Sequence, residues 1–575
     1  MNENKGMFKD QVEVSTRREG VYWTPLDWVA EMHNFMDGLY GSEWADETLI
    51  WDPCCGGGNL TRGLNPAYMI QTTLGQKDIN SLGGELQGEF RVRQEYDFLN
   101  DLIIPAHIDK MLKRASANKI PVLFLMNPPY VTPGKTAVRL DTSKKGATDT
   151  LVKGFMGGIY GCDQMFLQFL WRALIICREY KLQYRIGLFS ATTYLLRNSF
   201  DALRDILFTN VKFRDGFVFP SNHFEAITTK WMVLFAVYER NSKTPSPIEF
   251  NWHVKDRNRD GKIETIQKRK YYRLDKNKSM INWIKAVSRG ASSGDNVPCM
   301  TTGIRTKPRV SKLPKDAFGF FTFNNMYLQE RDNTYFTSSA SAANRGVAIL
   351  PSNFWRFIAG FSVMRLLNKN WATEKDEIHI PNTHDRMYRE WCYNALVYML
   401  FNKQNNSSGN TVDWEGEIWR LHNHMFWMEK SHVKSMWPDL DFDEPKYNHK
   451  VNRPYYQENS VPWTVLKLAE ASESNMLWPE SKVLLKNFLG LMDGMYRVRL
   501  SDHKIVQWRR WDAGYFQLRS MFYSCPGWDK ILIPSRQSLQ ARLISYIDRL
   551  GFFGVYGPGV LKIAYDRLSV EPVGR

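Results

Sequence analysis

A short apolar segment, Thr48–Trp51, runs directly into Asp52-Pro53, two cysteines and the three glycines Gly56–Gly58. Glycines that follow a strand immediately allow a tight turn and let a ligand approach the backbone closely. In doubly wound sheets, such turns hold nucleotide-like ligands at the point where the strand order reverses. The segment therefore predicts an α/β domain whose first strand ends at a ligand-binding turn, although a plain turn has the same composition.

Short apolar runs and helical stretches alternate through residues 1–241. Strands are predicted at Tyr68–Leu74, Val122–Met126, Arg185–Phe189, Val211–Phe219 and Trp231–Tyr238, and helices at Trp28–Met36 and Gln164–Cys177. Val211–Phe219 is expected to pair with the last of these strands. The alternation is typical of a Rossmann-like α/β domain with a mostly parallel sheet.

A second motif, Asn127-Pro128-Pro129-Tyr130, follows the buried strand Val122–Met126. The prolines rigidify the backbone and leave carbonyls without competing neighbouring donors. The Asn127 side-chain oxygen and the Pro128 carbonyl can then accept hydrogen bonds from one exocyclic amine, while Tyr130 offers a flat face to a base. An aromatic amine is a poor nucleophile because its lone pair is delocalised, and two converging acceptors favour the reactive, pyramidal amine. By itself the motif also fits a structural turn.

The two motifs occur in the order Asp-Pro-x-Cys-Gly-x-Gly-x-Leu and then Asn-Pro-Pro-Tyr, which resembles the amino-group DNA methyltransferases. In particular, the chain looks like the N6-adenine enzymes of the gamma arrangement, in which the cofactor motifs precede target recognition. The resemblance covers roughly residues 18–240 and implies a class I methyltransferase fold with S-adenosyl-L-methionine as cofactor. It also implies methylation of the N6 amine of an adenine flipped out of duplex DNA. The tandem Cys54-Cys55 departs from the family pattern.

The resemblance also implies which residues act. Catalysis is assigned to Asn127, Pro128, Pro129 and Tyr130, and cofactor binding to Tyr22, Thr24, Pro25, Asp52, Pro53, Cys55, Gly56, Gly58, Asp78, Asp97 and Phe98. Asp78 is expected to bind the ribose hydroxyls, and Asp97 to accept from the adenine amine while Phe98 packs on the ring. The structural alternatives are a helix N-cap at Asp78, and a capping Asp97 beside a core Phe98. Phe219 or Phe224 is expected either to sandwich the flipped base or to lie in the core.

Positive charge is concentrated in the second part of the chain. The net charge is +16, but residues 1–241 contain 27 basic and 27 acidic residues, so the whole excess lies in 242–575, with 14 of the 20 tryptophans. We therefore expect a methyltransferase catalytic domain at 1–241 and a basic, aromatic-rich target-recognition region of mixed α/β fold, with one or two subdomains, at 242–575. The basic-aromatic runs Lys268–Arg273 and Trp508–Trp511 are candidate DNA contacts. A solvated basic surface is the alternative.

Double-stranded DNA is the expected substrate, but other methyl acceptors remain open. RNA carries similar charge, glutamine-type protein methyltransferases share the Asn-Pro-Pro-Tyr tetrad, and cytosine-N4 enzymes more often have Ser at position 127. A cytosine-C5 enzyme is disfavoured because Cys54 lies in the cofactor turn and Cys525 precedes its proline. A fused nuclease is disfavoured because the acidic residues of 438–446 are too closely spaced for two strands. A catalytically inactive DNA-binding protein is the non-enzyme alternative.

No metal site, disulfide framework or membrane span is predicted. His422 and His424 lack a carboxylate or cysteine partner nearby, and the seven cysteines form no Cys-x-x-Cys pair. The longest apolar run, Trp231–Tyr238, is far shorter than the roughly 18 residues that a membrane span needs. Together with these absences, the resemblance to DNA methyltransferases implies a cytoplasmic, nucleoid-associated protein of a bacterial or phage-infected cell, acting alone or with a restriction subunit.

Overall fold

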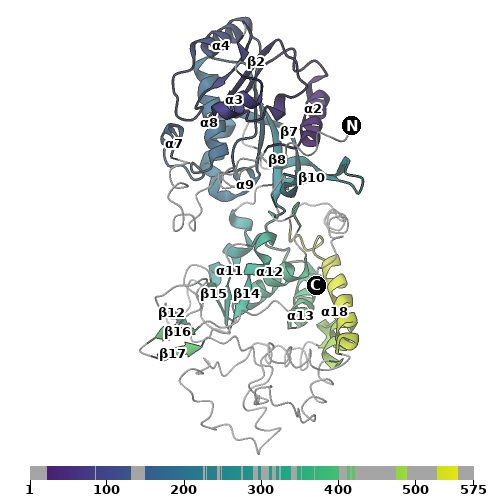
Figure 1. Ribbon diagram of the computed structural model, residues 1–575. Coiled ribbons are helices and arrows are strands. Elements are labelled where there is room, and N and C mark those ends of the chain that lie inside the picture. The colour runs from purple at the N-terminus through teal and green to yellow at the C-terminus, as the bar shows by residue number, and fades with distance from the viewer. Residues whose placement is uncertain are drawn as a thin grey trace, which may run out of the picture. The chain divides into compact units, whose positions relative to one another are not determined.

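The computed structural model of this chain forms two compact units, Met1–Leu274 and Asp275–Arg575 (Figure 1). The structure describes residues 23–84, 86–87, 89–130, 149–224, 227, 229–241, 247, 249–272, 276–288, 295–298, 310–313, 319–322, 326–337, 346–350, 352–367, 370–373, 375–400, 411–414, 417–420, 474–487 and 528–553. Several sequence predictions lie outside the described residues: Tyr22, His422 and His424, the segment 438–446, Cys525, and the run Trp508–Trp511.

The first unit is built on one ten-stranded sheet. Its strands are β1 (Leu49–Asp52), β2 (Tyr68–Thr73), β3 (Leu86–Gln87), β4 (Arg91–Glu95), β5 (Val122–Met126), β6 (Tyr184–Ala191), β7 (Val211–Pro220), β8 (Met232–Arg240), β9 (Glu249–Arg257) and β10 (Ile263–Tyr272). They lie in the order β10-β9-β7-β8-β6-β5-β1-β2-β4-β3. Neighbours from β4 through β2, β1 and β5 to β6 are parallel, whereas β8 runs antiparallel to both β6 and β7. This mostly parallel sheet confirms the predicted Rossmann-like α/β class.

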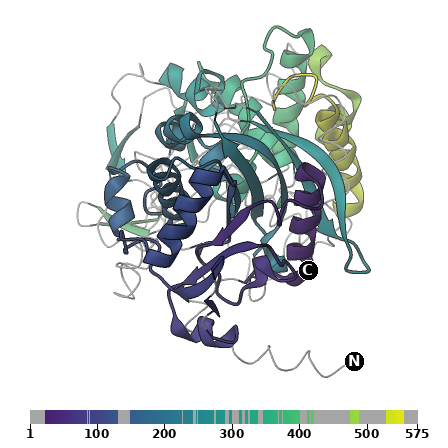
Figure 2. The ribbon, with the colours of Figure 1, turned by 90° about the horizontal axis from the view of Figure 1, so that it is seen from above.

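Helices cover both faces of this sheet, with the purple α2 on one side of the strands and the blue α4 on the other (Figure 2). The helices are α2 (Leu26–Tyr40), α3 (Gln76–Ser81), α4 (Ala106–Asn118), α7 (Leu151–Phe155), α8 (Met165–Glu179), α9 (Thr193–Leu196) and α10 (Asp201–Asn210), with the 3-10 turns η1 (Asn59–Thr61), η2 (Asn198–Phe200) and η3 (Ser221–His223). Trp28 of α2 packs in one core cluster with Ile50 of β1. Trp51, which follows Ile50 in β1, points to the opposite face of the sheet and contacts Phe98. The Phe98 ring stacks on Phe169 of α8.

Most of the predicted elements of this unit are present. The segment Val122–Met126 coincides with β5, and Tyr68–Leu74 is one residue longer than β2. The expected pairing of Val211–Phe219 with the last predicted strand is confirmed, because β7 and β8 form an antiparallel pair. The helix predicted at Trp28–Met36 is α2, which begins directly after Pro25. The continuous apolar runs of β5 and β8 made these two strands recognisable without knowledge of the sheet order.

The strand order reverses between β1 and β5. From β1 the chain leads outward to β2 and β4 on one side, and later from β5 to β6 on the other. In open α/β sheets, ligands bind outside the carboxyl ends of the strands at such a switch point. Asp52 is the last residue of β1, and Asn127 directly follows β5, its parallel neighbour. The fold therefore brings both sequence motifs to the place where a ligand crevice is expected.

The boundary of the first unit differs from the one predicted at residues 241/242. β9 and β10 lie beyond that boundary, but β9 pairs in parallel with β7 and β10 pairs with β9, so both belong to the same sheet. Phe250, Trp252 and Val254 of β9 are buried, which explains why the hairpin joins this unit. Residues 242–274 contain nine basic and four acidic residues, so the first unit carries a net charge of +5 and the second +11.

The second unit is of mixed α/β structure, as predicted for the C-terminal region. Its helices are α11 (Met280–Ser288), α12 (Phe354–Leu366), α13 (Arg386–Leu400), α18 (Trp528–Ser545) and a helix at 479–487, with the 3-10 turns η4 (Lys276–Lys278), η5 (Leu328–Asn333) and η8 (Ser474–Met476). Its strands are β11 (Asp295–Pro298), β12 (Val310–Leu313), β13 (Gly319–Thr322), β14 (Tyr335–Thr337), β15 (Gly346–Ile349), β16 (Thr411–Trp414) and β17 (Glu417–Arg420). They form the antiparallel sheets β11-β12, β14-β13-β15 and β16-β17.

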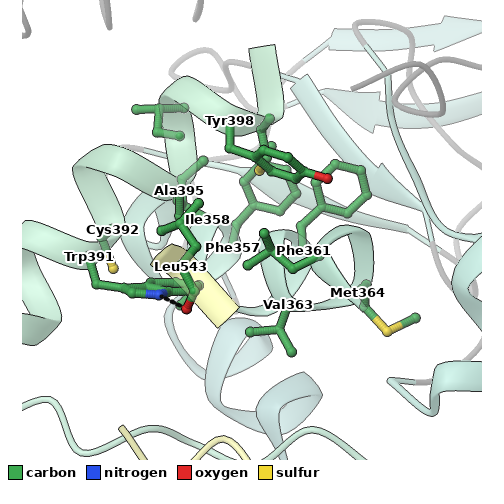
Figure 3. Close-up of a cluster of buried hydrophobic side chains, with 14 of the residues drawn as sticks. Phe357, Ile358, Phe361, Val363, Met364, Trp391, Cys392, Ala395, Tyr398 and Leu543 are labelled. Atoms are coloured by element: carbon green, nitrogen blue, oxygen red, sulfur yellow. Dashed lines mark hydrogen bonds between the residues drawn. The ribbon is translucent and has the colours of Figure 1, made fainter. Parts of the chain in front are cut away.

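Helices α12, α13 and α18 share one apolar core (Figure 3). Phe357 and Phe361 of α12 stack on each other with ring centroids 5.3 Å apart. Trp391 of α13 is fully buried, and its indole Nε1 donates a hydrogen bond to the Leu543 carbonyl of α18 at 3.0 Å. This unit therefore has a core of its own, separate from that of the Rossmann-like unit. Among the described residues, no helix is long and apolar enough to cross a membrane.

Candidate active site

The glycine turn after β1 is held in place by backbone hydrogen bonds. The Cys55 amide donates to the Thr72 carbonyl at the end of β2 at 2.9 Å, and the Gly58 amide donates back to the Cys55 carbonyl at 2.7 Å. Gly56 and Gly58 have φ values of +44° and +68°, which residues with a Cβ adopt at a cost. A Cβ on Gly58 would also lie 2.8 Å from a methyl group of Leu82. Gly58 is therefore required by its conformation and by its surroundings.

Substitution of Gly58 has a matched control within the same segment. We expect Gly58→Ala to lower the free energy of unfolding of the first unit by about 1–3 kcal/mol more than Gly63→Ala does, because it adds overpacking to backbone strain. Gly63 also has a positive φ, +84°, but a Cβ there would meet no atom within 4 Å. Urea unfolding followed by tryptophan fluorescence would measure both variants. Equal losses would show that Leu82 moves aside and that only the backbone matters.

Thr24 connects three parts of the site. Its carbonyl accepts a hydrogen bond from the Asn59 side chain at 2.9 Å, which ties the segment before α2 to the glycine turn. Its buried hydroxyl accepts from Nδ2 of Asn127 at 2.9 Å. Because the amide nitrogen of Asn127 donates to Thr24, the carbonyl oxygen of the same amide is turned away from Thr24. Residues far apart in the chain thus fix the orientation of the predicted catalytic amide.

Trp23 and Pro25 flank Thr24. The Trp23 indole lies against the glycine turn, since a Cβ on Gly56 would be 3.3 Å from its Nε1 and one on Gly57 3.8 Å from its Cε2. The ring is also 46% exposed, so it covers the turn from the solvent side. Pro25 caps the beginning of α2. The Trp-Thr-Pro segment therefore forms one wall of the site that the sequence assigned to the cofactor.

Asp52 has an unsatisfied buried carboxylate. The side chain is fully buried, and Oδ1 accepts from the Cys54 amide at 3.2 Å. Among the described residues, Oδ2 has no hydrogen-bond partner. Burial raises the pKa of this carboxyl to about 7, and hydrogen bonds from Cys54 offset the shift only in part. A buried acceptor without a partner at a switch point is the kind of group that a ligand amine or hydroxyl satisfies.

The cysteines next to Asp52 are unreactive. Burial raises the pKa of the Cys54 thiol well above its usual range, and burial likewise raises that of Cys55. Both therefore remain protonated near neutral pH, where only a thiolate would act as a nucleophile or metal ligand. In the part of the chain that the structure describes, no three His, Cys, Asp or Glu side chains are grouped so as to hold a metal ion.

The two acids after the glycine turn have hydrogen-bond partners nearby in the sequence. Asp78 lies in the first turn of α3 and accepts from the Thr73 hydroxyl at 2.9 Å. Asp97 accepts from the backbone amides of Leu99 and Asn100, both at 3.0 Å, so it caps this turn. Phe98 is buried in the core between Trp51 and Phe169. The predicted contacts of Asp78, Asp97 and Phe98 with a cofactor stay predictions.

Aromatic rings surround Tyr130 at the end of the second motif. Its ring forms edge-to-face pairs with those of Trp231 and Phe224, with centroids 5.5 and 6.4 Å apart. Its hydroxyl is buried, and burial raises the pKa of Tyr130 well above the usual range. Phe219, the other aromatic candidate, is fully buried and stacks on Trp28 at 4.0 Å. Phe219 is therefore a core residue, whereas Phe224 lies beside Tyr130.

Sequence reasoning missed three residues of this arrangement: Trp23, Asn59 and Trp231. Trp23 directly precedes Thr24 and Asn59 directly follows Gly58, so their position next to predicted site residues was a usable signal. Trp231 was interpreted only as the first residue of a strand. Its contact with Tyr130 depends on the pairing of β8 between β6 and β7, which no local pattern reveals.

Comparisons with known proteins yield only distant structural similarities. No protein-family model matches the chain, and no curated protein matches it. Solved structures similar to it include the ATP-dependent type ISP restriction-modification enzyme LlaBIII bound to DNA (15% identity, TM-score 0.28), the type IIG restriction endonuclease BpuSI (16%, 0.28) and the M protein of the type I restriction enzyme EcoKI (12%, 0.21). The matches cover 42%, 51% and 41% of this chain but only 20%, 38% and 48% of those chains. At these TM-scores they assign no activity.

Proposed function

We propose that this protein is an S-adenosylmethionine-dependent DNA methyltransferase that methylates N6 of an adenine flipped out of duplex DNA. The observation that carries the proposal is the position of the two motifs. Asp52 ends β1 and Asn127 directly follows its parallel neighbour β5 at the switch point, and Thr24 of the Trp-Thr-Pro segment bonds directly to Asn127. A fold alone does not imply a function, so the proposal rests on this constellation of side chains.

The residues at the switch point fit S-adenosylmethionine. The unpartnered Oδ2 of Asp52 suits the ammonium group of the methionine part, and the glycine turn permits close approach to the backbone. By resemblance to the family, Thr24 and Pro25 hold the methionine part, Asp78 the ribose, and Asp97 with Phe98 the adenine ring. When bound, S-adenosylmethionine supplies an electrophilic methyl group.

The second motif suits the activation of an exocyclic amine. The Asn127 side-chain oxygen and the Pro128 carbonyl accept hydrogen bonds from the target amine and stabilise the positive charge that develops on its nitrogen. Pro129 restricts the backbone between Pro128 and Tyr130. Tyr130, in edge-to-face contact with Trp231 and Phe224, provides an aromatic wall for the base. The amine loses one proton as its nitrogen gains the methyl group, and no strong general base is required.

Duplex DNA is the proposed substrate because of the charge distribution. The second unit carries a net charge of +11, which favours binding to phosphates, and the catalytic unit is itself basic. We also propose that the second unit provides target recognition, and that the protein works within a restriction-modification system. RNA, a protein amide and cytosine N4 are the alternative methyl acceptors.

The test is incubation of the protein with unmethylated duplex DNA and S-adenosylmethionine, followed by nucleoside digestion and mass spectrometry. We expect N6-methyladenine in the products. N4-methylcytosine instead would retain the site but overturn the base assignment. Cofactor binding without any methylated nucleoside would overturn the DNA substrate and direct attention to RNA or protein amides as acceptors.

The hydroxyl of Thr24 has a separate, testable role. Thr24→Val removes the acceptor for the Asn127 amide and keeps the side-chain shape. We expect the single-turnover rate of methylation at saturating cofactor to fall about tenfold, equivalent to about 1.4 kcal/mol, because the amide loses its fixed orientation. Thr24→Ser keeps the acceptor and should stay within about twofold of the wild-type rate. Equal losses in both variants would contradict the role of the hydroxyl.

A further inference from the structure

The β9–β10 hairpin extends from the sheet at the same edge as the candidate active site. β8 is antiparallel to both β6 and β7, so β7 runs in the direction of β6, and β9 is parallel to β7. The carboxyl end of β9, Arg257, therefore lies at the edge where β5 ends before Asn127. Phe217 and Val218 of β7 are level with His253 and Val254 of β9. The turn at residues 258–262 follows directly, so it lies at this edge.

The base of the hairpin is fastened to α2 by ion pairs. Arg257 donates to both carboxylate oxygens of Asp27, from Nε at 2.7 Å and from Nη2 at 2.9 Å. One turn further along α2, Glu31 pairs with Lys255 at 2.7 Å. Asp27 is only two residues beyond Pro25 in the segment that contacts the glycine turn. These pairs hold the hairpin next to the proposed cofactor and methylation site.

The tip of the hairpin is a compact turn that presents positive charge. The Asn258 side chain accepts from the backbone amides of Asp260 and Lys262, both at 3.0 Å, which orders the turn. Arg259 and Lys262 are exposed, and neither forms an ion pair with any described residue. Three basic residues of the strands, Lys255, Arg257 and Lys270, instead pair with carboxylates, whereas Lys268 of β10 is exposed like the cations of the tip. Asp260 is the acid of the turn, so the tip keeps a net positive charge.

We propose that this hairpin is a DNA-phosphate contact carried by the catalytic unit itself, with Arg259 and Lys262 on backbone phosphates beside the target base. The inference rests on the proposed function. It gives the catalytic unit a DNA-binding element of its own, in addition to the basic C-terminal unit. Contacts to phosphates fix the position of a protein on DNA without reading its sequence. An ordered turn with two cations that form no ion pair and a net positive charge suits that role at the active-site edge, and it would hold the target strand close to Asn127.

The salt dependence of DNA binding tests the proposal. Each phosphate contact contributes about −0.9 to the slope of log K against log salt concentration, so Arg259→Gln/Lys262→Gln should make the slope shallower by about two. Between 50 and 200 mM salt, the variant should then lose about tenfold less affinity than the wild-type protein. The control, Arg178→Gln/Lys181→Gln, removes two exposed cations where α8 leads into the opposite end of β6. Its slope should equal that of the wild-type protein.

The outcomes separate the two proposals. If the wild-type protein binds duplex DNA and the tip variant has the same slope of log K against log salt concentration, the hairpin contact is overturned. The proposed function would then remain intact. Equal loss of slope in the tip and control variants would overturn the hairpin contact as well, because the effect would then come from net charge alone. A wild-type protein that binds no DNA would overturn the proposed function and the inference together.

Discussion

Asn127→Ala should lower kcat for DNA methylation by about 10²–10³-fold, because it removes an acceptor that stabilises charge developing on the target amine. Affinity for the cofactor should fall much less than kcat, since Asp52, the glycine turn and the Asn59 bond to Thr24 remain although the Asn127 bond to Thr24 is lost. Single-turnover methylation of duplex DNA and calorimetric binding of S-adenosylhomocysteine measure the two quantities separately.

A conservative variant sharpens this result. Asn127→Ser keeps an oxygen acceptor on a shorter side chain, so we expect it to retain more activity than Asn127→Ala. If cofactor affinity falls as much as kcat, Asn127 acts mainly through its hydrogen bond to Thr24 and not on the target amine. An undiminished kcat in Asn127→Ala would remove the amide from the mechanism altogether.

Asp52 should make cofactor binding depend on pH. Its pKa is raised from 3.8 to about 7 by burial, so the carboxyl is mostly neutral at pH 5.5 and mostly ionised at pH 7.5. An ammonium ligand binds the ionised form, and we expect the affinity for S-adenosylhomocysteine to rise roughly 20-fold over this range. Asp52→Asn should bind weakly with little pH dependence. If the wild-type affinity for S-adenosylhomocysteine does not change between these pH values, the result would contradict a contact between Asp52 and the ammonium group.

The same carboxyl should affect stability in the opposite direction when no ligand is bound. The folded protein holds the Asp52 proton more tightly than the unfolded chain does, because the folded pKa is the higher one. The free energy of unfolding therefore falls as pH rises from the unfolded value of 3.8 towards 7, and Asp52→Asn should remove this part of the decline. Urea unfolding of the ligand-free proteins at several pH values measures it.

Local sequence signals predicted the parts of the site that depend on neighbours in the chain. The glycines after Asp52 and the prolines after Asn127 end buried strands, and both features can be recognised without a tertiary structure. The strand order could not be predicted in this way. That β1 and β5 are neighbours, and that Thr24 reaches Asn127 across 103 positions, depends on long-range pairing.

The extent of the sheet beyond residue 241 could not be predicted for a related reason. A polar stretch marks exposure to solvent, but it does not say whether the next strand rejoins the same sheet. β9 does so through its buried Phe250 and Trp252. The run Lys268–Arg273 also shows the limits of composition, because Arg269 and Tyr271 are buried on β10 while the neighbouring Lys270 pairs with Glu249.

The two hydrogen bonds of Thr24 have a thermodynamic consequence. Its carbonyl accepts a hydrogen bond from Asn59 of the glycine turn, and its hydroxyl accepts one from Asn127. The position of the segment that contains Thr24 is therefore coupled to the orientation of the Asn127 amide. A ligand that stabilises the docked segment also increases the population of correctly oriented Asn127. By linkage, a base bound at Asn127 increases the affinity for the ligand at the glycine turn by the same factor. We therefore expect cofactor and target base to bind cooperatively.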